Sequence, residues 1–379
     1  MKHAALALAF LLAASPAYAQ LGGLNKALGK AKDAKEKTDK LSDLHFSDKE
    51  ERQLGEHVSG LLIDHFGVFQ DKAVTKYVSL VGTVLAKASP RPDLEWQFIV
   101  LDTEGVNAYA APGGLIYITR GALGLIKSEA ELAGVLGHEI AHVTEKHTIN
   151  AIRKSNATEL TIDAGAARAP GGGLSTTFIN AVGSKIYADI FENRFDRGDE
   201  MGSDKVGITL ASKAGYAPNG MIQFLNKISE RNKDMQEPNG VFASHPLMKD
   251  RISAMEKTIR TDRLTTTAAV AARYTGAISL EAKPMSAIAM NVAGVRGAVG
   301  DTPAASTKET AKQDPPKRGG LLGGLGLTKG KQAENTQTVA SAGSRGGVPD
   351  RDAVGGPNKS KLRVTITPGD LADFKKGIA

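Results

Sequence analysis

The segment His138-Glu139-Ile140-Ala141-His142 constrains this chain more than any other feature of its sequence. It ends a proline-free run whose apolar side chains recur at helical spacing, so we predict one helix from Ser128 to about Lys154. On a helix the two histidines lie one turn apart on one face, where their rings can bind a single metal ion. The glutamate between them can take a proton from a water on that ion. The alternative is an amphipathic helix with two buried, hydrogen-bonded histidines.

The remaining protein ligand must come from elsewhere, because two histidines and a water leave a tetrahedral zinc one ligand short. Glu145 shares the face of His138, but it lies about 10 Å along the axis, too far unless the helix breaks. A second predicted helix, residues 199–214, carries Glu200 and Asp204 on one face. One of these carboxylates can bind the metal while the other accepts the remaining ring N–H of a histidine ligand. Other nearby acids also compete: Asp189, Glu192, Asp196 and Asp199.

The order of these motifs carries a family resemblance. HEIAH followed by DEMGSD resembles the gluzincin arrangement, HExxH and then ExxxD on a second helix. Four further segments match in the same order: residues 107–118, 128–133, 142–147 and 244–252. Over about residues 47–260 the chain resembles the HtpX-like and CAAX-prenyl-protease-like zinc metallopeptidases, and most closely their soluble periplasmic, BepA-like branch. This resemblance implies an α+β, mostly helical, zincin-like domain with a small sheet, followed by a disordered tail.

The same resemblance implies roles for the residues of the two motifs. His138, His142 and Glu200 would bind one Zn²⁺ per chain, and Asp204 would support a zinc-bound histidine. Zinc lowers the pKa of its water toward about 7, so Glu139 can act as the general base that activates this water for attack on a peptide carbonyl. Glu139 can then pass the proton to the leaving amine.

The resemblance also implies roles for two segments outside these motifs, residues 107–118 and 244–252. Residues 107–118 are predicted to form a hairpin around Pro112-Gly113-Gly114. The same stretch, with Asn107, Gly113 and Gly114, is expected to supply an edge strand to which a substrate peptide can add. His245 is expected near the active site, where it either helps to stabilise the oxyanion or occupies the open zinc position as a latch. Arg251 is expected either to contact the oxyanion or to have a structural role.

A third histidine follows the motif at His147, nine residues after His138. On one continuous helix this spacing corresponds to a rotation of about 180°. We therefore predict that His147 faces away from the metal and is a packing or surface residue.

The N-terminus has the pattern of a cleaved secretory signal peptide. Lys2 precedes an apolar run, residues 4–14, and Ala17-Tyr18-Ala19 offers a cleavage site. The run is too short to span a bilayer. The chain contains no cysteine, which excludes a disulfide framework and a thiolate metal site. We expect an exported, periplasmic bacterial protein that is soluble after signal cleavage.

The net charge suggests what kind of partner to expect. It is +7, and it falls to +6 (7 − 1) when Lys2 leaves with the signal peptide. Much of the excess lies near the termini, which favours an envelope or membrane-surface partner. No nucleic-acid motif is present, so nucleic acid is not expected. The expected substrates are unfolded or unassembled proteins and peptides, and the sequence does not define an oligomeric state.

Composition divides the chain into six parts. These are a signal peptide (1–19), a basic tether (20–46), the zinc metallopeptidase domain (47–262), a small-residue-rich extension (263–300), a low-complexity linker (301–361) and a C-terminal element (362–379). The linker has too few large apolar residues for a core, so we expect disorder. Residues 362–367 alternate like a strand and are predicted to dock back or bind a partner. Residues 164–173 are expected to form a mobile lid.

Other predicted elements within the domain are a strand at 95–101 and helices at 47–66, 72–88, 176–191, 218–233 and 251–260. The expected function is a zinc-dependent metalloendopeptidase that hydrolyses peptide bonds of envelope proteins in protein quality control. The alternative is a periplasmic chaperone or assembly factor whose protease site is latched by His245.

Overall fold

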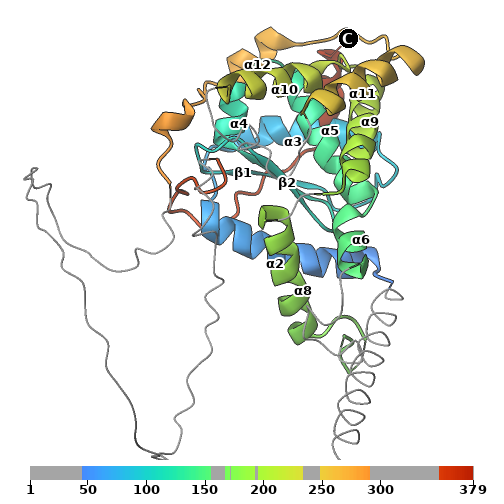
Figure 1. Cartoon of the computed structure of the whole chain (residues 1–379), viewed down its shortest axis with the longest axis vertical. Coiled ribbons are helices and arrows are strands. Elements are labelled where there is room, and N and C mark those ends of the chain that lie inside the picture. The colour runs from blue at the N-terminus through green and yellow to red at the C-terminus, as the bar shows by residue number, and fades with distance from the viewer. Residues whose placement is uncertain are drawn as a thin grey trace, which may run out of the picture. The chain divides into compact units, whose positions relative to one another are not determined.

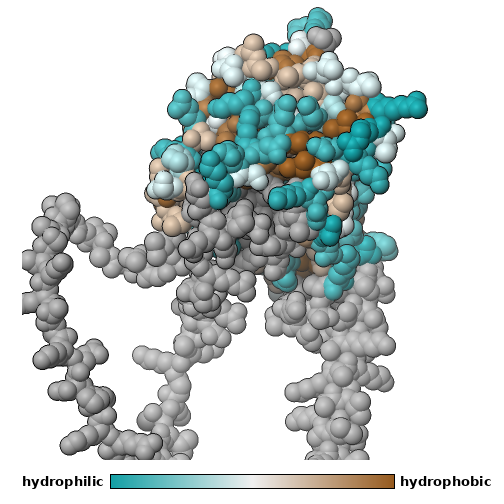
Figure 2. All heavy atoms as spheres, turned by 45° about the horizontal axis from the view of Figure 1, so that its top comes forward, coloured by the Kyte–Doolittle hydropathy of each residue, from teal (hydrophilic) through white to brown (hydrophobic). Residues whose placement is uncertain are grey.

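The computed structural model describes residues 45–154, 167–170, 172–192, 195–233, 248–290 and 350–378. All of them fall in one compact unit, which is mostly helical around a small sheet, as predicted (Figure 1). Among these residues, no helix combines the length and the hydropathy needed to cross a membrane. On the face shown in Figure 2, hydrophilic side chains surround a band of hydrophobic ones.

The sheet contains β1 (Gln97–Leu101), β2 (Ala108–Ala111) and β3 (Leu115–Thr119) in the order β1-β3-β2. β1 runs parallel to β3, whereas β2 pairs antiparallel with β3 through the predicted hairpin. The hairpin turn requires glycine because Gly113 and Gly114 have φ values of +74° and +88°. Of the segment 107–118 that was expected to supply an edge strand, only β2 lies at an edge, because β3 is the central strand. All four residues of β2 are buried.

The strands are buried on both faces because a separate hydrophobic cluster covers each side. Phe98 and Val100 belong to the cluster that includes α3 (Lys72–Lys87), while Ile99 and Leu101 belong to the cluster that includes α2 (Asp48–Phe66). Figure 1 shows these two helices on opposite sides of the sheet. This explains why the strands read as nearly continuous apolar runs instead of alternating.

The two N-terminal helices begin at capping residues. Ser47 accepts a hydrogen bond from Glu50 N, and the Glu50 side chain bonds back to Ser47 N, the capping box expected from the sequence. Asp71 caps α3 through Ala73 N and Val74 N. Each cap contributes about 1 kcal/mol to stability.

The predicted single helix over residues 128–154 is wrong. The structure has α5 (Glu129–Thr144) and α6 (His147–Lys154), separated at Lys146, whose φ is 56°. No proline or glycine marks the break. Two tertiary contacts stabilise it: Arg91 donates to the Val143 carbonyl at 3.1 Å, and the Lys146 ammonium lies 2.5 Å from buried Glu51.

The remaining predicted helices of the domain are confirmed. They are α8 (Thr176–Glu192), α9 (Arg197–Lys213), α10 (Gly220–Arg231) and α11 (Met248–Thr261). α8 packs on α2, while α9 and α10 pack on α5, which therefore lies at the centre of the helical layer. α4 (Arg120–Leu125) was not predicted.

The small-residue-rich extension packs on the domain as far as Met290, through α12 (Ala271–Ala277) and a 3-10 turn (Met285–Ala287). The C-terminal segment differs from prediction, because residues 350–361 were assigned to the disordered linker. Asp350 is fully buried, and Arg231 and Val106 N donate to its carboxylate at 3.0 and 2.7 Å. Residues 301–349 lie outside the described residues.

The last part of the chain docks as a helix. Residues 362–367, predicted to be strand-like, form no strand, and α13 (Pro368–Lys376) follows with a capping box at Thr367. Arg273 connects this helix to the domain. It forms an ion pair with buried Glu129, at the start of α5, and its guanidinium group stacks over the ring of Phe374 in α13. The proposed lid lies partly outside the described residues, and its Arg168 forms an ion pair with Glu50.

Candidate metal centre

Two glycines set the distance between the helices that carry the candidate ligands. A Cβ atom on Gly207 would lie 2.7 Å from His138 N, and one on Gly137 would lie 2.8 Å from the Gly207 carbonyl oxygen. Neither separation is possible for a real side chain, so α5 and α9 approach backbone to backbone. This contact brings Glu200 and Asp204, on the turns of α9 that precede Gly207, against His138.

Three side chains converge at this crossing. The Nε2 atoms of His138 and His142 are 3.1 Å apart, and the Glu200 carboxylate oxygens lie 3.6 and 3.5 Å from them. One ligand atom from each residue lies within 4.8 Å of the other two, and all three side chains are buried. Within the described ranges this is the one such group of histidine and acidic residues. Two imidazoles and a carboxylate suit zinc, and as the three donors found in the described part of the chain they would leave one tetrahedral position for a water.

The structure also resolves which acid faces the histidines. Glu200 supplies the converging carboxylate, while Asp204 lies behind the first histidine, with its Oδ1 3.0 Å from His138 Nδ1. Of the competing acids, Asp199 contacts His147, and Asp196 and Asp189 pair with lysines. The side chain of Glu192 lies outside the described residues.

Arg251 holds both acids of α9. Its Nε and Nη2 donate to the two oxygens of Asp204 at 2.7 Å, and its Nη1 lies 3.1 Å from Glu200 Oε2. Burial alone would raise the pKa of Asp204, but the charge and hydrogen bonds of Arg251 outweigh it and lower that pKa to about 2. Arg251 is itself 1% exposed. Its contacts are those of a residue that orients the site.

His147 does not face away from the centre, as the helical projection predicted. Because the chain breaks at Lys146, its Nδ1 lies 3.0 Å from His142 Nδ1, and its Nε2 lies 3.6 Å from Asp199. Burial lowers the pKa of His147 despite the nearby carboxylate, so the neutral ring is favoured. A neutral His147 can accept the Nδ1 proton of His142, which turns the Nε2 lone pair of His142 toward the centre.

Replacing His147 by alanine should therefore weaken zinc binding about 10- to 100-fold, because His142 loses the partner that orients its ring. The dissociation constant can be measured by competition with a chromogenic chelator. Asn150→Ala, a change at a half-buried position of the same helix α6, should leave the affinity unchanged. Equal affinities for the two variants would show that His147 only fills space.

Glu139 and the predicted substrate strand lie next to the three converging side chains. Glu139 is buried on α5 between the two histidines. Burial would lower the pKa of Arg251, but the charges of Asp204, Glu200 and Glu139 outweigh it and raise that pKa. β2 packs against α5, and its last residue Ala111 lines a cavity of about 10 Å³ with Pro112 and His142. Asn107 is buried, and its side chain accepts from Ala108 N at 2.9 Å.

The predictions for the two hairpin glycines and for His245 remain to be compared with the structure. Gly113 and Gly114 lie in the hairpin turn against Arg52 and Trp96, so they shape the strand and are not among the converging residues. His245 lies outside the described residues, and its predicted role as latch or oxyanion contact stays a prediction.

Comparison with known proteins agrees with this geometry. Residues 72–259 match Peptidase family M48. A putative beta-barrel assembly-enhancing protease of Vibrio cholerae is 29% identical over 206 residues, which cover 52% of this chain and 42% of the relative. The beta-barrel assembly-enhancing protease of Escherichia coli K12 is 23% identical over 54% of this chain and 42% of its own length.

A mitochondrial relative shares the same region. The mitochondrial metalloendopeptidase OMA1 of Schizosaccharomyces pombe is 28% identical over 183 residues, covering 48% of this chain and 52% of the relative. The chain thus spans about half, or less, of the length of these curated relatives.

Proposed function

Because residues 72–259 belong to peptidase family M48, we propose that this chain is a zinc-dependent metalloendopeptidase. The observation that carries the proposal is the convergence of His138, His142 and Glu200 at one buried point, with Glu139 between the two histidines on α5. These three donors, the ones that the described residues provide, would leave the fourth position to a water, as in a catalytic zinc site and unlike a closed structural one.

A zinc ion held there would polarise a peptide carbonyl and make a coordinated water acidic. The protein's own groups prepare the site for this. Asp204 and His147 engage the Nδ1 atoms of the two histidines, so both Nε2 lone pairs point to the same place. Arg251 keeps Asp204 ionised and orients Glu200. Glu139 would accept the proton of the attacking water and return it to the leaving amine.

We further propose that the substrates are unfolded or unassembled proteins of the bacterial envelope, cleaved in protein quality control. The names of two relatives, beta-barrel assembly-enhancing proteases, support this substrate class. The signal-peptide pattern at the N-terminus supports export to the periplasm. β2 supports it too, since a peptide paired with an edge strand is held mainly by its backbone and not by its sequence.

The purified protein should contain one zinc per chain, and casein cleavage should follow the zinc content. A strong chelator should remove both together, and one equivalent of zinc should restore both. Elemental analysis and a fluorescent casein assay on the same samples test this expectation. Full cleavage by protein shown to be metal-free would overturn the proposed chemistry.

A further inference from the structure

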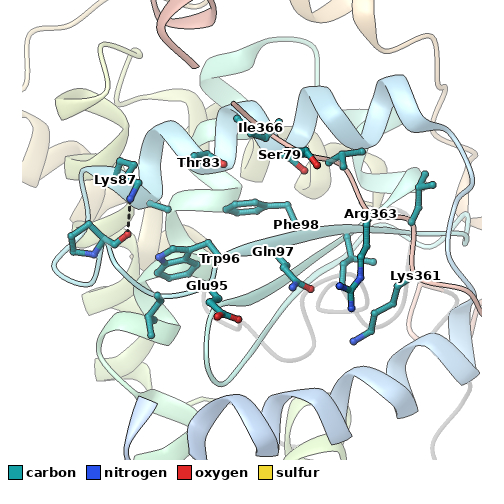
Figure 3. A pocket seen from close by; sticks show the side chains of 17 residues that line it. Ser79, Thr83, Lys87, Glu95, Trp96, Gln97, Phe98, Lys361, Arg363 and Ile366 are labelled. Atoms are coloured by element: carbon teal, nitrogen blue, oxygen red, sulfur yellow. Dashed lines mark hydrogen bonds between the residues drawn. The ribbon is translucent and has the colours of Figure 1, made fainter. Parts of the chain in front are cut away.

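A groove lies along the sheet edge opposite the one beside the candidate metal centre. It has a volume of about 510 Å³ and is lined by α3, by β1 and by residues 361–366 of the C-terminal segment (Figure 3). The strand order places β1 at one edge of the sheet and β2, which packs on α5, at the other. The groove is therefore separate from the site that contains His138 and Glu139, and its volume is that of a ligand site.

β1 offers open backbone groups to this groove. Gln97 N donates to the Gly114 carbonyl, so the alternate residues Phe98 and Val100 turn their backbone groups to the outer edge. The Val100 carbonyl already accepts from Phe69 N at 2.9 Å. Phe98 lines the groove, and its outward backbone groups form no hydrogen bond with the rest of the described structure. Such an edge is a template for an added strand.

The groove is also positively charged. Its lining contains three cations, Lys87, Lys361 and Arg363, and one acid, Glu95. Lys361 is paired with Glu56. Lys87 and Arg363 are exposed, and neither forms an ion pair within the described part of the chain. Figure 3 shows Lys87 and Arg363 on opposite sides of Phe98 and Gln97. A ligand that lies along β1 would meet a cation toward each end.

We propose that this groove binds an extended peptide segment of another polypeptide that carries acidic side chains. The peptide backbone pairs with Phe98 at the open edge of β1, and its carboxylates lie near Arg363 and Lys87. Backbone pairing supplies the affinity, and the two cations select acidic over basic sequences. This binding does not depend on peptide cleavage at the metal centre.

The chain carries a built-in reporter for this proposal. Trp96 is its only tryptophan, and the residue lines the groove beside Phe98 (Figure 3). Its indole N–H donates to the Arg91 carbonyl at 3.0 Å, which holds the ring in place. A peptide in the groove should therefore change the fluorescence of Trp96.

The test uses full-length protein carrying Glu139→Gln, so that added peptides are not cut. The probes are peptides of about nine residues in which valine and threonine alternate, a length typical of a strand. One carries two glutamates, a second carries two lysines instead, and a third is the glutamate peptide with alternate backbone nitrogens methylated. The glutamate peptide should give a saturable change in Trp96 fluorescence. The lysine and N-methylated peptides should each bind about tenfold more weakly or not at all.

A charge reversal locates the binding site. Arg363→Glu should weaken binding of the glutamate peptide about fivefold or more, since an attractive contact becomes repulsive. The control is Lys375→Glu, which reverses the charge of an exposed residue on α13 outside the groove and should leave binding unchanged. The proposal is overturned if the glutamate peptide gives no saturable signal, if the lysine peptide binds equally well, or if Arg363→Glu has no effect. If Arg363→Glu has no effect, the peptides bind elsewhere, for example only at the metal centre.

Discussion

Replacing Glu139 by glutamine is expected to abolish casein cleavage while leaving one zinc bound per chain. The side chain is buried between the two histidines of α5, and glutamine has nearly the same size, so the fold should persist. An amide cannot accept the proton of the attacking water. General-base catalysis is worth about 10²- to 10⁴-fold, and we expect a loss in kcat near the upper end of that range.

The matched control is Glu145→Gln, the same chemical change at the exposed C-terminal end of α5. This variant should keep both the zinc and the full rate. Zinc content, the far-ultraviolet circular dichroism spectrum and the kcat for a fluorescent casein should be measured on all three proteins. Wild-type turnover by Glu139→Gln with its zinc in place would remove Glu139 from the mechanism.

Local signals in the sequence were sufficient to predict most elements of the domain. Ser47 and Glu50 predict the start of α2 because a capping box involves only neighbouring residues. Pro112, Gly113 and Gly114 likewise predict the hairpin turn, since two successive positive φ angles favour glycine. The two histidines of α5 could be placed together because helical spacing alone brings them to one face.

What the sequence did not predict depends on contacts between distant residues. The chain breaks at Lys146 because Arg91 and Glu51, both remote in sequence, stabilise the ends of α5 and α6. The error in the position of His147 follows directly from that break. Asp350 was assigned to a linker by its neighbours' composition, although Arg231 binds it more than a hundred residues away.

The choice between Glu200 and Asp204 shows the same limit. Both lie on one helix face, so spacing cannot rank them, and only the family resemblance separated them. In the structure, the close contact of α5 and α9 at Gly137 and Gly207 determines which acid faces the metal centre. It places Glu200 near the Nε2 atoms of both histidines and Asp204 near His138 Nδ1. The two glycines were a visible signal in the sequence whose meaning required the partner helix.

The second large effect is expected from Arg251→Met. Methionine fills much of the same volume, but it leaves the buried carboxylates of Asp204 and Glu200 without the cation that contacts both. Removing one partner of a buried ion pair typically costs about 3–5 kcal/mol. We expect a loss of that size in the free energy of unfolding, measured on metal-free protein by urea denaturation at pH 7. Arg197→Met, which breaks an exposed pair with Asp250, should cost less than about 1 kcal/mol.

The pH dependence separates this charge effect from a packing defect. In the wild type, Arg251 and, to a smaller extent, His138 outweigh burial and lower the pKa of Asp204 from 3.8 to about 2. This group therefore contributes stability above about pH 4 and loses that contribution as the pH falls toward 2. In Arg251→Met the effect of Arg251 is lost and only the contact with His138 opposes burial, so the pKa of Asp204 rises above its wild-type value. The buried carboxylate then costs more stability at neutral pH, and this cost falls as Asp204 becomes protonated. The deficit relative to wild type should therefore be largest above pH 4 and narrow as the solution is acidified. A deficit that stays constant from pH 7 to pH 3 would assign the loss to packing around residue 251 and not to its charge.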